Sequence, residues 1–234
     1  MNIIALYQKS ISKLYWFNGI PALLLRLFLA PIMIIAGFSK LNLSDPDVTG
    51  FEILLASDNV VNWFSNAEWG LGLPYAEVLA NLAAWTEFLG GWMLLIGLFT
   101  RLITLPLMFT MVVAATTVHL EHGWFAVAPS NSAVSTANVL DWLGIDAAQR
   151  SLENSDQVYV RLNKMREILA ENGNTDWLFE KGNIGVMNNG IELAATYFIM
   201  LLALLFIGGG RFTSADYYLY TYWLKPKLQL NNTL

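Results

Sequence analysis

The sequence predicts an all-α polytopic membrane protein: a four-transmembrane-helix bundle with helical loops outside the membrane. Hydrophobic residues make up 56% of the 234 residues, charged residues only 13%, and the mean hydropathy is +0.47. These values lie outside the usual range of soluble domains. The apolar residues gather in long runs, and one run contains the carboxylate of Glu87. A charge in the middle of a bilayer costs about 2.5–3.5 kcal/mol, so we expect a compensating group beside it.

Four apolar runs are candidates for crossing the membrane. About 20 helical residues, rising 1.5 Å each, span the roughly 30 Å of hydrocarbon. We expect such helices at about residues 19–39, 78–98, 102–119 and 191–207, within a single membrane domain of residues 1–234. The second and third runs are separated by Phe99, Thr100 and Arg101 alone, which predicts a transmembrane hairpin.

Basic residues near the helix ends predict the orientation, because lysine and arginine near helix ends stay in the cytoplasm. One side of the bundle carries Lys9, Lys13, Arg101, Arg211, Lys225 and Lys227. The loops of the other side span about residues 42–74 and 120–190, and the first of them is acidic. Both termini should therefore be cytoplasmic. Trp16, Phe17 and the aromatic run at residues 217–223 fit a belt at the cytoplasmic interface.

The outer loops contain amphipathic segments. In residues 152–170, Val158, Leu162, Met165 and Ile168 recur at helical spacing, which predicts a helix lying on the bundle or on the outer membrane surface. Residues 51–64 predict a second, shorter helix.

Charge and cysteine content exclude several classes of function. The net charge of −5, without a basic stripe, excludes nucleic acid as a partner and leaves the lipid bilayer. The chain has no cysteine, which excludes disulfides, thiolate-held iron–sulfur clusters and covalent c-type haem.

Arg26 is the first candidate partner for Glu87. Counted from the helix ends, the two residues lie about 10 Å and about 16 Å from the cytoplasmic side, so their side chains can meet if the helices are adjacent. Small residues share the helix faces of both charges, a pattern of close helix packing: Ala80, Ala84 and Gly91 beside Glu87, and Ala22, Ala30 and Gly37 beside Arg26. Such a pair either fixes helix register or handles protons in catalysis.

A second polar cluster is expected at the outer end of the bundle, formed by Lys40, His119, His122 and Glu192. The two histidines are three residues apart and share a helix face. They could ligate a metal, donate to a quinone carbonyl or an oxyanion, or form a structural hydrogen bond. Two histidines are a weak metal signal, since most zinc and copper sites have three or four ligands. Trp85 and Trp92, seven residues apart, either flank a flat ligand such as a quinone or pack against lipid.

The sequence resembles the DoxX family of small four-helix membrane proteins. The resemblance follows all four apolar runs in order and rests on short motifs around them: Leu24-Leu25-Arg26-Leu27, Ala36-Gly37-Phe38-Ser39-Lys40-Leu41, Glu87 with Gly90-Gly91, Gly97-Leu98-Phe99-Thr100-Arg101, Ala114-Ala115 with His119 and Gly123, and Glu192 with Gly208-Gly209-Gly210-Arg211-Phe212, Ser214 and Asp216. The two outer loops are longer than in the usual compact member of the family.

The resemblance implies a quinone-linked redox role in the bacterial inner membrane. Some relatives are associated with a thiosulfate:quinone oxidoreductase, and others with redox defence, amine-dehydrogenase maturation or metal-linked operons. In this hypothesis Arg26 and Glu87 handle charge, while Lys40, His119 and Glu192 receive a quinone head or a small anion. The sequence shows no flavin motif or haem-attachment site, so electrons would come from a quinone or a redox partner protein. Two alternatives are a non-catalytic anchor or assembly factor that docks a soluble enzyme through its outer loops, and a conduit for a small solute.

Overall fold

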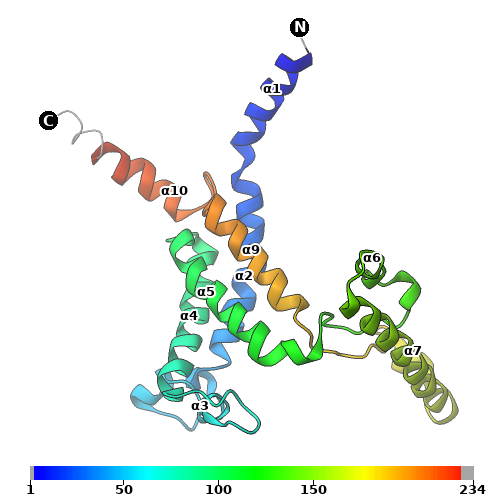
Figure 1. The fold of residues 1–234 in the computed structure, drawn as a ribbon. Coiled ribbons are helices and arrows are strands. Elements are labelled where there is room, and N and C mark those ends of the chain that lie inside the picture. The colour runs from blue at the N-terminus through cyan, green and yellow to red at the C-terminus, as the bar shows by residue number, and fades with distance from the viewer. Residues whose placement is uncertain (1–2, 228–234) are drawn as a thin grey trace. The chain divides into compact units, whose positions relative to one another are not determined.

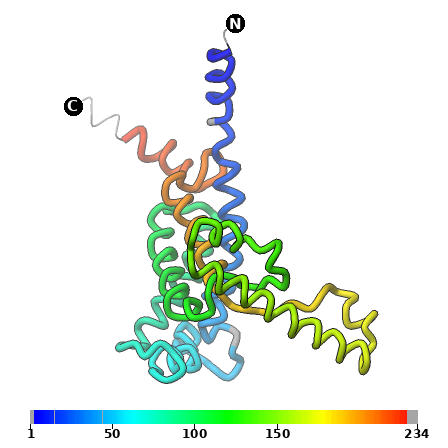
Figure 2. Tube along the Cα trace, turned by 45° about the vertical axis from the view of Figure 1, so that its right-hand side comes forward, coloured from blue at the N-terminus to red at the C-terminus, as the bar shows by residue number. Residues whose placement is uncertain are grey.

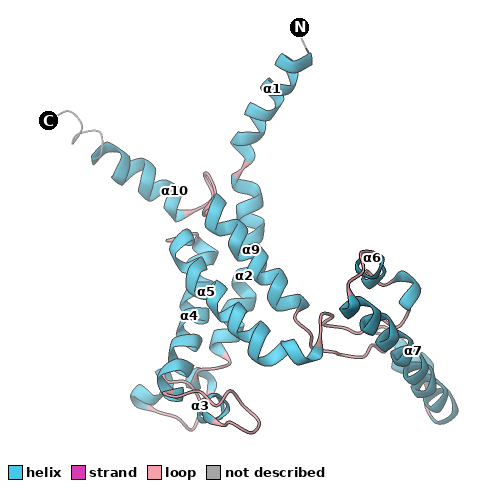
Figure 3. Cartoon of the chain, in the orientation of Figure 1, coloured by secondary structure: helices cyan, strands magenta, loops and turns pink. Residues whose placement is uncertain are grey.

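The computed structural model describes residues 3–227, and these residues form helices and loops without a strand (Figure 3). Two isolated β-bridges, Leu41 with Ala56 and Val127 with Met187, tie loop segments together. The chain divides into two compact units, one formed by Met1–Val113 with Thr196–Leu234 and the other by Ala114–Ala195. The all-α class is confirmed, and the expectation of a single membrane domain stays a prediction.

The first unit contains a helix bundle packed around an apolar core (Figure 1). Its helices are α2 (Gly19–Phe38), α4 (Ala76–Ile96), α5 (Thr100–Ala114) and α9 (Glu192–Ile207), of which α5 and α9 extend slightly into the second unit. Each contributes side chains to the core, whose buried members are Ala22, Leu29, Ala30, Met33, Leu94, Leu107, Met111, Leu201 and Leu204.

Three helical segments are long and apolar enough to cross a membrane: Gly19–Phe38, Ala76–Ile96 and Thr100–His122. The third extends beyond α5 through a π-helical turn, Ala115–His119, and a 3-10 turn, Leu120–His122. The helix α9 is equally apolar but has 16 residues, about 24 Å at 1.5 Å per residue. The predicted span boundaries therefore agree with the observed helix ends within a few residues. The fourth membrane crossing stays a prediction.

Glycines set the close approach of α2 and α4. A Cβ atom on Gly37 would collide with the backbone of Phe88, and one on Gly91 would lie 2.7 Å from the backbone nitrogen of Ile34. Ala84 of α4 is fully buried beside this crossing. The predicted packing of small residues between these helices is confirmed, and it sets Glu87 level with the last two turns of α2.

Short helices extend the first unit at both ends of the bundle. The N-terminal α1 (Ile3–Leu14) leads through the 3-10 turn η1 (Tyr15–Phe17) into α2, and α10 (Ala215–Leu219) with the π-helical turn η7 (Tyr220–Leu224) follows α9 (Figures 1 and 2). At the other end, the loop between α2 and α4 holds η2 (Asn42–Ser44), η3 (Gly50–Leu54) and α3 (Asp58–Ser65).

The prediction of one helix over residues 51–64 is wrong. The segment folds as η3 and α3, separated by Leu55, Ala56 and Ser57. The break is held from outside the segment, because the Ala56 amide donates to Asn81 Oδ1 (2.8 Å) and the Ser57 amide donates to the Lys40 carbonyl (2.9 Å). Tertiary hydrogen bonds have replaced helical ones here.

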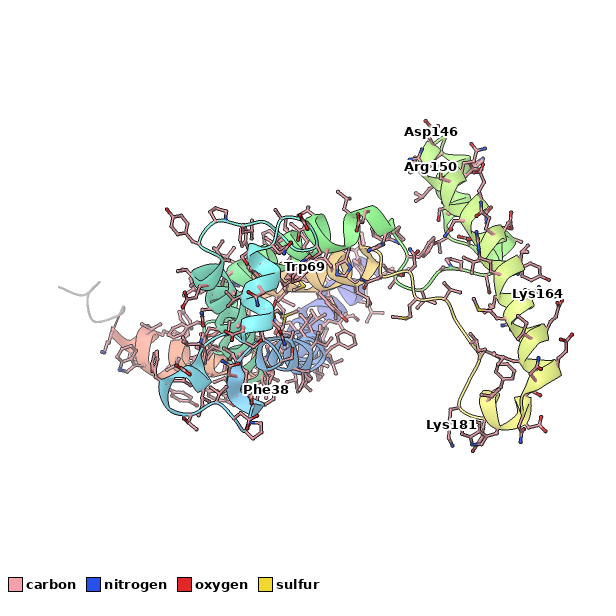
Figure 4. All side chains as sticks on the ribbon, turned by 90° about the horizontal axis from the view of Figure 1, so that it is seen from below. Phe38, Trp69, Asp146, Arg150, Lys164 and Lys181 are labelled. Atoms are coloured by element: carbon pink, nitrogen blue, oxygen red, sulfur yellow. The ribbon has the colours of Figure 1, made fainter. Side chains whose placement is uncertain are left out.

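The second unit is built around a long helix, α7 (Asp146–Asn172), with η6 (Ser132–Val134), α6 (Ala137–Trp142) and α8 (Thr175–Phe179). Figure 4 labels Asp146, Arg150 and Lys164 along α7. The predicted amphipathic helix is confirmed and is longer than expected. Val158 and Leu162 are buried, whereas Met165 and Ile168 are about half exposed, so the apolar stripe is covered only in part.

Candidate functional site

Glu87 forms an ion pair with Lys40. The Lys40 ammonium donates to Glu87 Oε2 and to the carbonyl of Ala36 (3.3 Å). The Glu87 side chain is 7% exposed, and the Lys40 side chain is 27% exposed. Glu87 lies eleven residues after Ala76 and nine before Ile96, which places it near the middle of α4. The buried carboxylate is thus compensated by a cation that enters from the end of α2.

The expected Arg26–Glu87 pair is wrong, and the direction of side chains on a helix explains why. Side chains of an α-helix lean toward its N-terminus. Lys40 lies two residues after the end of α2, and its ammonium reaches back to the Ala36 carbonyl and Glu87, whereas the guanidinium of Arg26 leans along α2 away from Glu87. The residues on α4 that Arg26 reaches are Leu94 and Leu95, two turns beyond Glu87.

Arg26 instead joins the other ends of the helices. Its side chain is fully buried, and Nη1 donates to the carbonyls of Leu94 and Leu95 (both 3.3 Å), while Nη2 donates to the Thr213 carbonyl (2.7 Å). The last carbonyls of a helix lack intrahelical partners and carry the negative end of its dipole. A buried cation is accommodated there without a carboxylate in contact. This geometry favours the structural interpretation of Arg26.

Asp216 supports the same end of the bundle. Its two carboxylate oxygens accept from the backbone amides of Phe99 (2.7 Å) and Thr100 (2.9 Å), which open α5. Arg101 in turn donates to the carbonyls of Leu205 (3.1 Å) and Phe206 (3.0 Å) near the end of α9. Sequence reasoning used Arg101 for orientation and Asp216 for the family resemblance, and missed both contacts. The unpaired amides expected at the start of any helix were the available signal.

Aromatic rings border the Lys40–Glu87 pair. Phe38 is the last residue of α2, and its ring centroid lies 6.2 Å from that of Phe88, the residue after Glu87. Trp85 meets Phe88 edge-on at 5.9 Å and donates from Nε1 to the Leu54 carbonyl (2.9 Å). Trp92 lies further along α4 and is 47% exposed. The charged pair therefore lies beside several aromatic rings.

The predicted outer cluster has members in both units. Within the second unit, His119 Nδ1 lies 2.7 Å from the Asn189 carbonyl, and Glu192 Oε2 accepts from the Ala126 amide (3.0 Å). The side chain of Asn188 donates to the carbonyls of His122 (2.6 Å) and Phe125 (2.9 Å). His119 and Glu192 thus both hold loop backbone. Because Lys40 belongs to the first unit, its assembly with them stays a prediction.

Metal ligation was one interpretation of the two histidines. Among residues 3–227, no group of three or more His, Cys, Asp or Glu side chains is placed to hold a metal ion. His122 Nε2 lies 3.7 Å from a carboxylate oxygen of Glu121, and the Glu121 side chain is 83% exposed. A metal at His119 and His122 would need ligands from outside the described part of the chain.

A cavity of about 690 Å³ opens in the loop between α2 and α4, and sequence analysis did not identify it. Its charged lining residues are all acidic: Asp45, Glu52, Asp58 and Glu77. Such a lining repels anions and is a poor environment for an apolar quinone ring. The cavity therefore does not compete with the Lys40–Glu87 pair as a site for a quinone head.

Comparison with protein families identifies part of the chain. The DoxX family model matches residues 22–120, which include Arg26, Lys40, Glu87 and Arg101. No curated protein and no solved structure matched the chain. The match covers the candidate span Ala76–Ile96 in full, Gly19–Phe38 from Ala22 onward, and Thr100–His122 up to Leu120. The resemblance is thereby confirmed for residues 22–120, which match the DoxX family model.

Proposed function

We propose that this protein is a quinone-linked redox subunit, or an accessory protein, of an oxidoreductase system in the bacterial inner membrane. The proposal includes four membrane crossings and cytoplasmic termini, as the distribution of basic residues predicts. The single observation that carries it is the Lys40–Glu87 pair, in which a carboxylate buried within a spanning helix meets an ammonium at an aromatic border.

The residues present fit a quinone head. A quinone supplies the capacity to take up two electrons together with two protons. The ammonium of Lys40 is a donor for a carbonyl oxygen, and it holds a proton at Nζ beside Glu87 Oε2. Groups paired in this way can exchange a proton during acid–base chemistry. The rings of Phe38, Trp85 and Phe88 offer flat apolar contacts for the ring of the ligand. The fuller site, with Trp92, Arg26, His119 and Glu192, is part of the same proposal.

Electrons must come from outside this chain. The sequence contains no flavin motif and no haem-attachment site, and its lack of cysteine excludes thiolate ligands for a cluster. A soluble or membrane redox partner would therefore hold the electron-transfer centre, while this chain positions the quinone and moves protons.

Quinone retention tests the proposal. We would purify the full chain in mild detergent, extract it with organic solvent, and measure quinone per protein by mass spectrometry. We expect near-stoichiometric quinone in the natural protein and a loss of about tenfold in Glu87→Gln and Lys40→Gln, the effect of removing about 1.4 kcal/mol of binding. Glu77→Gln is the matched control, since Glu77 lies on the same helix and is exposed. Equal quinone in all four proteins, or none in any, would contradict the proposal.

A second candidate function is a membrane anchor or assembly partner for a soluble enzyme. The second unit exposes large apolar side chains, including Trp142 (84%), Val134 (78%) and Trp177 (71%). Exposed apolar residues in number mark surfaces for binding protein or membrane. A soluble protein that copurifies stoichiometrically, and is lost in Trp142→Ser while quinone is absent throughout, would establish this function instead.

A further inference from the structure

Arg211 presents an unpaired cation at one end of the first unit. Its guanidinium carbon lies 4.6 Å from the ring centroid of Trp16 and 5.1 Å from that of Phe212. The two rings are nearly parallel, 16° apart, with centroids separated by 6.1 Å. Within residues 3–227 the guanidinium forms neither an ion pair nor a hydrogen bond. Ring contacts orient the cation and leave its N–H donors available.

The position of Arg211 corresponds to the membrane interface. Arg211 lies four residues after the end of α9, and Trp16 lies three residues before α2 begins. The two segments are in contact, because a Cβ atom on Gly19 would collide with the Arg211 carbonyl and Thr213 Oγ1 donates to the Gly19 carbonyl (3.3 Å). With α2 and α9 crossing the bilayer as predicted, this position is at the depth of the lipid headgroups.

The charge of this end of the bundle favours an anion. Lys9, Lys13, Lys225 and Lys227 flank the site in sequence, and residues 1–44 contain no acidic residue. Asp216, the nearest acidic residue that follows, is already occupied by the amides of Phe99 and Thr100. A second cation–ring contact, between Lys227 and Trp223 (4.0 Å), repeats the same arrangement after α10.

We propose that Arg211, held against Trp16 and Phe212, binds the phosphate of an anionic phospholipid in the membrane leaflet at this end of the bundle. A guanidinium matches two phosphate oxygens with parallel N–H donors, which a lysine ammonium cannot do. The exposed ring of Trp16 (59%) is an amphipathic neighbour for the glycerol region of the lipid, and that of Phe212 (44%) is an apolar one. The site is distinct from the Lys40–Glu87 pair and does not depend on quinone binding.

Native mass spectrometry of the full chain tests the site. The protein in mild detergent is mixed with equal amounts of phosphatidylglycerol and phosphatidylcholine, and retained lipid is counted on the natural protein and on Arg211→Gln. We expect preferential retention of phosphatidylglycerol and a loss of about fivefold in the variant, the effect expected for one interfacial basic residue. Lys181→Gln is the control, because it removes one positive charge from an exposed residue of the second unit.

Lipid retention by the natural protein tests the proposal even if Arg211→Gln folds poorly. Equal retention of the two lipids by the natural protein would overturn the site, as would unchanged retention in a folded Arg211→Gln. Inorganic phosphate distinguishes the two sources of the same chemistry. Displacement of phosphatidylglycerol by millimolar phosphate would overturn the lipid assignment in favour of free phosphate, whereas retention in its presence supports the lipid. Arg211→Lys should recover only part of the loss, since an ammonium keeps the charge but not the paired donors.

Discussion

Removing either partner of the Lys40–Glu87 pair should have unequal consequences for stability. Glu87 lies about 16 Å from one end of α4 and about 14 Å from the other at 1.5 Å per residue, and its side chain is 7% exposed, so its carboxylate is buried within the bundle. Lys40→Met would leave that carboxylate without its cation. Glu87→Gln would leave an ammonium that is already 27% exposed and can turn toward the interface.

The burial of the two charged groups sets the expected losses in unfolding free energy. Stranding a buried charge costs about 3–5 kcal/mol, so we expect Lys40→Met to lose about 3 kcal/mol of unfolding free energy. Glu87→Gln replaces a charge-assisted hydrogen bond by a neutral one and should lose about 1 kcal/mol. The double variant retains no stranded carboxylate and should lose about 1.5 kcal/mol, so the coupling energy is about 2.5 kcal/mol.

A double-mutant cycle measures this coupling. The four proteins would be unfolded in mild detergent by titration with a denaturing detergent and followed by circular dichroism. Glu68→Gln, on an exposed loop residue, is the control and should change stability by less than about 0.5 kcal/mol. Additive losses in the double variant, or a larger loss from Glu87→Gln than from Lys40→Met, would refute the reasoning.

Two further predictions concern the helix contacts. Arg26→Lys should lower the unfolding free energy by about 2 kcal/mol in the same assay, because the guanidinium reaches the three carbonyls from two separate nitrogen atoms, whereas an ammonium has all its donors on one; unchanged stability would mean that charge alone matters. Gly37→Ala should cost about 1–3 kcal/mol through overpacking against the backbone of Phe88. Gly185→Ala is its control, since a Cβ atom there meets only Val127 at 3.6 Å, and equal melting temperatures for both variants would contradict the close approach of α2 and α4.

The candidate site was predictable in its residue types but not in its pairing. Glu87 and Lys40 were both identified as functional candidates, since the hydropathy of the sequence shows a carboxylate inside one apolar run and a lysine at the end of another. Their contact was missed because counting residues from helix ends locates Cα atoms, whereas the long side chains of Arg26 and Lys40 carry their charges several ångströms along the helix. The prediction of one helix over residues 51–64 failed for a related reason, since the side-chain oxygen that binds the Ala56 amide and interrupts the helix comes from Asn81 on α4.

The sequence by itself determined the helical class, the approximate span boundaries and the small-residue contact between α2 and α4. Length, apolarity and helical periodicity are properties of consecutive residues, and a bilayer permits few structures besides helices. Only the tertiary structure decided that Glu87 pairs with Lys40, that Arg26 and Asp216 join helix ends, and that Arg211 meets Trp16. These contacts depend on the register between helices and on the direction of each side chain, and residues far apart in the chain set both.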